Sequence, residues 1–109
     1  MIIIKTNKLK IGGIALFPLV FINSTLSIGR QTILINHERI HIRQQIELLV
    51  LPFYIIYIFS YLYFRIIGFN HQLSYRKIIF EKEAFSNERN LDYLKQRQMW
   101  SFSKYFFSI

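Results

Sequence analysis

The sequence predicts an α+β protein that is mainly α, with short N-terminal strands followed by two long helices. Two changes of pattern support this fold class. Residues 1–35 are rich in β-branched residues broken by turn residues, and residues 36–97 have the composition and spacing of helices. The length of 109 residues and the hydrophobic content of 52% suffice for one domain, residues 1–109. That content is high for a small chain, so part of the surface is expected to meet lipid or another chain.

Two or three short strands are predicted within residues 1–35. Runs of Ile, Leu, Val, Phe and Thr end here at turn-forming residues, namely Gly12-Gly13, Pro18, Asn23-Ser24 and Gly29. A strand containing Pro18 would be confined to the sheet edge, because proline has no N–H to donate. The start of the chain, Met1–Lys5, lacks a small-residue cleavage site and makes a poor secretory signal. We therefore expect a chain that is not clearly secreted.

A first long helix is predicted over residues 36–67. Its first half, residues 37–47, is polar and charged, whereas the seventeen residues from Leu48 to Phe64 carry no charge. Pro52 should kink this helix. The uncharged run is at the lower length limit for crossing a bilayer. Two placements therefore stay open, one in or on a membrane and the other as a buried core helix.

A second helix is predicted over residues 73–97, after a connection at residues 68–71. Apolar residues recur in it at helical spacing, namely Ile78, Ala84, Phe85, Leu91 and Leu94. The tail, residues 98–109, is aromatic and basic. This composition suits an interfacial anchor, and packing against the strands explains it equally well.

The net charge of the chain indicates which classes of partner it attracts. Fourteen Lys and Arg against six acidic residues give a net charge of +8, which attracts nucleic acid and anionic lipid alike. The basic residues are scattered and match no nucleic-acid-binding module, so nucleic acid is not an expected partner. The absence of cysteine excludes disulfides and thiolate ligands, so any metal must bind His, carboxylate or water.

The segment His37-Glu38-Arg39-Ile40-His41 has the residue types and spacing of a metal-binding catalytic site. Two histidines four residues apart on a helix share one face, so both imidazoles can reach a single ion. Glu38 then projects towards a water in the open position of the metal, where it can act as general base. The competing interpretation is a solvated helix surface on which these residues have no ligand.

A third ligand is expected from the second helix, which carries four acids: Glu81, Glu83, Glu88 and Asp92. Two of them flank Lys82 and lead into Ala84, a small residue that would let this helix approach the first closely. The competing interpretation is an ordinary pair of exposed carboxylates balanced by neighbouring basic residues.

With these two segments the chain resembles the gluzincin metallopeptidases, in which HExxH and a later glutamate bind zinc. It looks most like the membrane prenyl-protease and heat-shock peptidase family and the peptidase domains of beta-lactam-sensing receptors, and it also resembles short bacterial proteins built from these two helices. The resemblance covers about residues 33–95. It implies a zincin-like minimal core, Zn²⁺ as cofactor, His37 and His41 as ligands, Glu38 as base and a peptide or protein substrate.

The family pattern leaves two registers for the third ligand. Glu81 fits the family string better, but Phe85 then stands where an aspartate normally orients a histidine. Glu83 is the alternative, with Asn87 at that place. Asn87 and Gln45 are therefore the candidates for supporting the metal ligands.

The transition-state donor is expected to be His71, in the loop between the helices, with Tyr75 and Arg76 as alternatives. An extended strand within residues 14–35 would hold the substrate by edge pairing. The protein is expected to be membrane-associated, in the bacterial inner membrane if integral, or else cytoplasmic. The alternatives are a non-enzymatic basic membrane-associated protein, an inactive metal-binding remnant and a membrane-active peptide.

Overall fold

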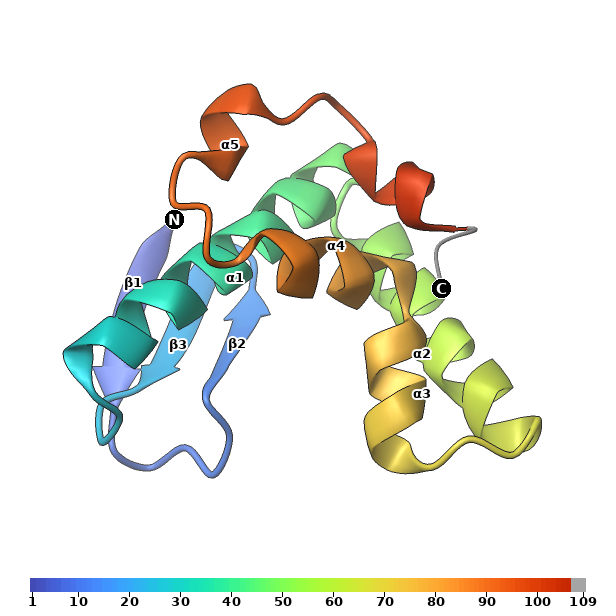
Figure 1. Ribbon diagram of the computed structural model, residues 1–109, viewed down its shortest axis with the longest axis horizontal. Helices are drawn as coiled ribbons and strands as arrows, with labels where there is room; N and C mark the ends of the chain where they lie inside the picture. The colour runs from blue at the N-terminus through green and yellow to red at the C-terminus, as the bar shows by residue number, and fades with distance from the viewer. Residues whose placement is uncertain (107–109) are drawn as a thin grey trace.

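The computed structural model describes residues 1–106 and is α+β, mainly α, as predicted (Figure 1). A small sheet is followed by helices, of which α1 covers one face of the sheet. The strands are β1 (Ile2–Thr6), β2 (Gly13–Leu16) and β3 (Leu19–Asn23). The helices are α1 (Ile28–Glu47), α2 (Leu51–Ile66), α3 (His71–Lys77), α4 (Ile79–Asn87), α5 (Tyr93–Gln96) and the 3₁₀ helix η1 (Ser101–Tyr105).

The sheet has the strand order β1-β3-β2. β1 runs parallel to β3, and β2 pairs with β3 in the antiparallel direction, with Ala15 opposite Val20. Pro18 lies in the turn between β2 and β3, outside both strands. β2 is therefore an edge strand, and its second edge is turned away from β3.

Helix α1 begins at Ile28 and not at about residue 36, because Ser27 caps it. The Ser27 hydroxyl accepts a hydrogen bond from the Arg30 N–H at 3.2 Å, which satisfies a donor of the first turn. The β-branched residues of this segment favoured strand in the sequence. Packing of Leu34 and Ile35 on the sheet overrides that local preference.

The predicted helix over residues 36–67 is two helices, α1 and α2, whose axes differ by 114°. The chain turns at Leu49 and Val50, which both have positive φ. Pro52 follows in the first turn of α2. N–H groups in a first turn make no hydrogen bond within the helix, so the lack of an N–H in proline costs nothing there. The proline thus starts a new helix instead of kinking a continuous one.

The predicted helix over residues 73–97 is also divided. Ile78 is extended, with φ −62° and ψ 131°, and it separates α3 from α4. No proline or glycine marks this break in the sequence. The Ile78 side chain is fully buried against Phe53 and Phe80, so tertiary packing determines where the chain turns.

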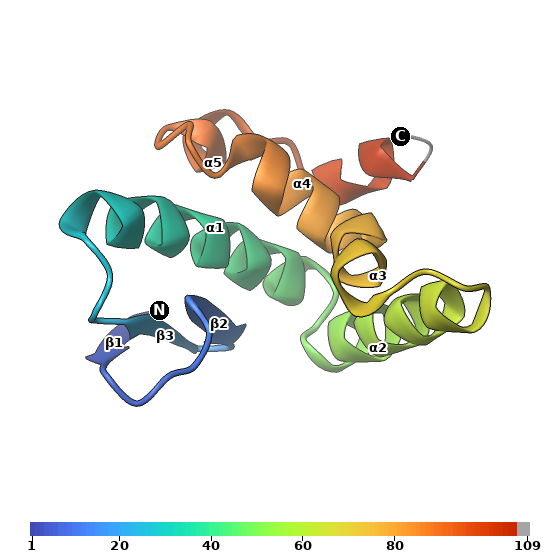
Figure 2. The ribbon, with the colours of Figure 1, turned by 60° about the horizontal axis from the view of Figure 1, so that its bottom comes forward.

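Two hydrophobic clusters hold these elements together, and α1 lies between the sheet and α4 (Figure 2). The first cluster joins the sheet to α1 and contains Ala15, Val20, Ile22, Leu34 and Ile42. The second joins α2, α4 and η1 and contains Phe53, Ile78, Phe80 and Phe102. The tail therefore packs through Phe102 against helices and not against the strands. Residues 107–109 of the tail lie outside the described residues.

No single helix in residues 1–106 is long and apolar enough to cross a membrane. Helices α1 and α2 pass that test only as a pair, across their bend. Phe53 is the only fully buried residue of α2. The expectation of a buried core helix for residues 48–64 is therefore wrong.

Candidate metal centre

The polar residues of α1 are buried, because this part of the helix lies between the sheet and α4. His37, Glu38 and His41 are 2%, 6% and 4% exposed. Gln44 and Gln45 are buried as well. A solvated helix surface is therefore excluded for this segment, and each buried polar group needs a partner.

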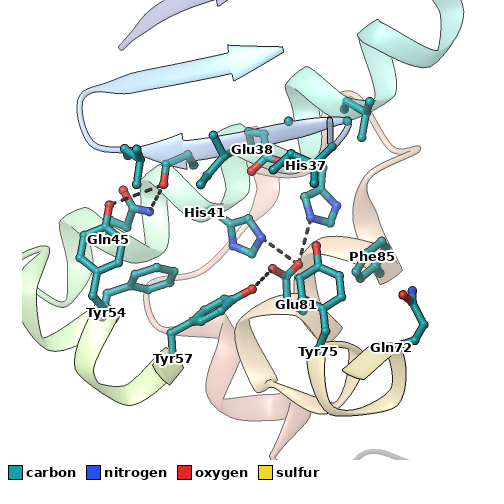
Figure 3. A pocket seen from close by; sticks show the side chains of 18 of the residues that line it. His37, Glu38, His41, Gln45, Tyr54, Tyr57, Gln72, Tyr75, Glu81 and Phe85 are labelled. Carbon is teal, nitrogen blue, oxygen red and sulfur yellow. Dashed lines mark hydrogen bonds and ion pairs between the residues drawn. The ribbon is translucent and has the colours of Figure 1, made fainter. Parts of the chain in front are cut away.

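The two histidines converge on one carboxylate oxygen (Figure 3). Nε2 of His37 lies 3.0 Å from Oε1 of Glu81, and Nε2 of His41 lies 2.9 Å from the same oxygen. Ligand atoms of His37, Glu38 and His41 lie within 4.8 Å of one another. The group of His37, Glu38 and His41, with Glu81 in contact with both imidazoles, is therefore a candidate metal centre.

Electrostatics couple Glu81 to the histidines. Burial opposes the charge of Glu81, yet His41 and His37 hold the pKa of this carboxyl well below its usual range. Burial would also lower the pKa of His41, but Glu81 more than offsets it and raises that pKa to about 9. Without metal, a proton on His41 thus supplies the positive charge that Glu81 requires.

Two tyrosines surround Glu81 on its other side. The Tyr57 hydroxyl, from α2, donates to Oε2 of Glu81, and Tyr75, from α3, lies on the same side of this carboxylate (Figure 3). Burial and the adjacent Glu81 raise the pKa of both phenols. Both tyrosines therefore stay protonated and can donate.

Glu38 lies under β2, next to Gly13. A methyl group on Gly13 would lie 3.4 Å from Cγ of Glu38 and 3.0 Å from the Phe21 carbonyl oxygen. Burial raises the pKa of Glu38, although His41 and His37 act in the opposite direction. The Glu38 carboxylate is thus buried and close to both imidazoles.

The outer nitrogens of the two imidazoles face side chains that the sequence did not single out for this purpose. Nδ1 of His41 lies 2.8 Å from Oε1 of Gln44. Nδ1 of His37 lies 3.4 Å from Oε1 of Glu88, at ion-pair distance. Phe85, at the place of the family aspartate, packs edge-on against the His37 ring with centroids 4.6 Å apart.

The position of Glu88 had a signal in the sequence. It follows Glu81 by seven residues, a spacing that places both on one helix face. The family pattern instead predicts the supporting acid four residues after the ligand, at the place of Phe85. The carboxylate that faces His37 is therefore one turn further along.

Glu83 points away from the histidines and is fully buried with Arg97. Arg97 also binds both carboxylate oxygens of Glu47, at 2.8 and 2.9 Å. Gln44 donates to Glu83 at 2.9 Å while its oxygen contacts His41. Glu83 thus belongs to a network that fixes Gln44 and, through it, His41.

The remaining predicted residues have other contacts. Gln45 ties α1 to β2, since its carboxamide accepts from the Phe17 N–H at 3.0 Å and donates to the Ala15 carbonyl at 2.9 Å. Asn87 donates to the Glu83 carbonyl and to the Tyr105 hydroxyl. Gln45 and Asn87 thus have partners other than the histidines, and Gln44 and Glu88 are the residues that face the imidazoles.

The three candidate transition-state donors have different partners. His71 is the first residue of α3 and not a loop residue, is exposed, and has Nδ1 2.8 Å from the Tyr61 hydroxyl. The Arg76 guanidinium lies over the Phe85 ring, 3.8 Å from its centroid. Tyr75 lines the cavity beside Glu81 (Figure 3), so it is better placed than either of them.

A cavity of about 600 Å³ opens onto these side chains. It is bounded by β2, α1, α2, α3 and α4, and its lining includes His37, Glu38, His41, Glu81 and His71. Its volume suits a small ligand or a short stretch of polypeptide.

Comparison with protein-family models, curated proteins and solved structures finds no match to the chain. The site is therefore interpreted from its own geometry.

Proposed function

We propose that this protein is a zinc-dependent peptidase in which His37, His41 and Glu81 bind the metal and Glu38 is the general base. The observation that carries the proposal is the approach of two imidazole Nε2 atoms to within 3.0 Å of one buried carboxylate oxygen. The resemblance of residues 33–95 to gluzincins is consistent with the same assignment.

The donor set fits zinc. Two histidines and one glutamate are the three protein ligands of one group of catalytic zinc sites, with a fourth position left for water or substrate. The outer nitrogens of both imidazoles face an oxygen, of Gln44 or of Glu88. Such contacts orient the rings so that the inner Nε2 atoms of both are directed at Glu81.

The cavity residues supply the rest of the chemistry. Zinc, when bound, contributes Lewis-acid polarisation of a water molecule and of the scissile carbonyl. Glu38 accepts the proton of the attacking water and delivers it to the leaving amine. Tyr57 and Tyr75 lie beside Glu81 and can donate to the oxygen that gains negative charge.

The edge strand β2 suits an extended peptide. The Gly12 carbonyl accepts from the Asn23 N–H, so antiparallel alternation directs the peptide groups of Gly13 and the N–H of Ala15 towards the free edge, whereas the Ala15 carbonyl already accepts from Gln45. That edge lies along the cavity. A substrate strand can pair there while its scissile bond reaches the histidines.

Metal content and hydrolysis test the proposal together. The wild type, purified without chelators, should contain one zinc per chain, which elemental mass spectrometry measures. Glu81→Gln should lose the metal, whereas the exposed Asp92→Asn, which removes the same charge, should keep it. Glu38→Gln should keep the zinc and lose hydrolysis of an unfolded protein such as casein.

Each contrary result has a distinct meaning. Absence of zinc from the wild type would contradict the metal assignment. Stoichiometric zinc without hydrolysis of casein or of a peptide library would contradict the peptidase assignment. The protein would then be a metal-binding protein.

A further inference from the structure

Helix α2 has a large apolar surface that nothing in residues 1–106 covers. The helix lies at the periphery of the molecule, beyond the end of α1 (Figure 2). One side of α2, with Phe53 and Tyr57, packs on the second hydrophobic cluster. The opposite side, here called the outer face of α2, consists of exposed residues: Ile55, Ile56, Ile58, Phe59, Leu62, Tyr63 and Ile66.

The outer face lacks the charges that a helix in water normally carries. A helix at the surface of a soluble protein is apolar on one side and polar on the other. Leu51 to Phe64 has no charged residue on either side, and Arg65 is the only charged residue of α2. Phe59 is 67% exposed and Ile66 is 82% exposed. A continuous apolar surface of this kind indicates a binding partner.

We propose that the outer face of α2 lies in the interfacial region of a membrane that contains anionic lipids. The chain has a net charge of +8, so a second copy would be repelled, whereas anionic headgroups attract it. Arg65 follows the apolar face, and Arg76 and Lys77 end the adjoining helix α3. Tyr63, exposed on the same face, has the apolar ring and polar tip that suit the headgroup boundary.

The proposed orientation is along the membrane plane. Helix α2 is about 24 Å long at 1.5 Å per residue, and it leaves α1 at 114°. The half of α1 next to the bend carries the buried polar residues of the candidate metal centre, which lipid could not solvate. The membrane therefore contacts α2 from outside while α1 stays within the protein.

This contact bears on the substrate, and here the inference rests on the proposed peptidase. Tyr54 and Tyr57 of α2 line the cavity. The helix that lies on lipid thus forms one wall of the candidate active site. The substrates would be polypeptide segments at the membrane surface.

Vesicle sedimentation tests the membrane contact. The wild type should sediment with phosphatidylcholine vesicles that contain phosphatidylglycerol, and less with phosphatidylcholine alone. Ile55→Glu and Phe59→Glu should each weaken binding roughly tenfold or more, because a charge must then enter the apolar boundary. Ile28→Glu, a 72% exposed residue at the opposite end of α1, makes the same charge change and should bind like the wild type.

Fluorescence locates the contact. Trp100 is the only tryptophan, so a Trp100→Phe background allows a single reporter. Phe59→Trp in that background should shift to the blue on anionic vesicles and be quenched by brominated lipid. Ile28→Trp in the same background should show neither change.

Three outcomes would overturn the inference. They are vesicle binding by Phe59→Glu equal to the wild type, no vesicle binding by the wild type, and a wild-type dimer that Phe59→Glu dissociates without any lipid binding. The last would make a second copy the occupant of this face. Glu81→Gln should bind vesicles like the wild type, so a failure of the peptidase proposal leaves this test intact.

Discussion

Nδ1 of His37 lies 3.4 Å from Oε1 of Glu88, while Nε2 of the same ring lies 3.0 Å from Oε1 of Glu81. One buried imidazole thus lies between two carboxylates that are two helical turns apart, hydrogen-bonded to Glu81 and at ion-pair distance from Glu88. A carboxylate behind a histidine fixes the ring and raises its basicity towards a metal. Glu88 is seven residues from Glu81, so it provides this contact from outside the family position occupied by Phe85.

Replacing Glu88 by Gln should weaken zinc binding by roughly 10- to 100-fold, because the carboxylate behind His37 is lost while the size of the side chain is kept. Competition with a chromophoric chelator measures the affinity. Asp92→Asn, which removes an exposed carboxylate, is the matched control. An affinity for Glu88→Gln equal to that of the control would show that this contact does not support the site.

Arg97→Met should lower the free energy of unfolding by about 3–5 kcal/mol, because it leaves buried carboxylates without their cation. The Arg97 side chain is fully buried and binds both Glu83 and Glu47. Urea denaturation measures the change. Lys95→Met, at a side chain that is 82% exposed, should change stability by about 0.5 kcal/mol or less. Equal stabilities of the two variants would contradict a structural function for the Arg97 network.

Gly13→Ala should be destabilising by about 1–3 kcal/mol, because its methyl group would meet the Phe21 carbonyl oxygen at 3.0 Å, and backbone cannot move cheaply. The same methyl group would lie in ordinary van der Waals contact with Cγ of Glu38, at 3.4 Å, so the strain comes from the Phe21 carbonyl. A methyl group on Gly29 in α1 would meet no atom within 4 Å apart from its own helix backbone, and Gly29→Ala should stabilise the protein by about 0.4–1 kcal/mol. Thermal unfolding of both variants checks the opposite signs. Equal effects would mean that the Phe21 carbonyl of β3 does not lie this close to Gly13.

The metal-free protein should become less stable as the pH rises above neutral. Burial lowers the pKa of His41, but Glu81 and, to a smaller extent, Glu38 raise it from 6.5 to about 9 in the folded state. The resulting stabilisation is fully present below pH 6.5 and is lost as the pH rises through about 9. Zinc requires the unprotonated imidazole, so the zinc-loaded protein should not lose stability in this way.

Unfolding midpoints across this pH range, with chelator or with zinc, measure the effect. His41→Gln with chelator is the control and should show a flatter profile. A chelated wild type whose midpoint is as flat as that of the variant would contradict the coupling of His41 to Glu81.

Local spacing determined much of this protein from the sequence alone. The fold class followed from β-branched runs broken by turn residues and from the helical composition after them. The four-residue separation of His37 and His41 was enough to place both imidazoles on one face, since the helix repeat fixes that geometry without reference to the rest of the chain. Pro52 also marked correctly where the first helical segment would be disturbed.

Tertiary structure alone decided the features that depend on contacts between distant residues. The choice of Glu81 over Glu83 beside the histidines, the place of Gln44 and Glu88 behind the rings, and the break at Ile78 depend on how α4 packs against α1 and α2. Glu81 and Glu83 are both buried acids of one short helix, and helical spacing does not say which of them faces a neighbour. Burial creates that difference, because each buried carboxylate must meet a cation or a donor, and only the packed elements determine which one it meets.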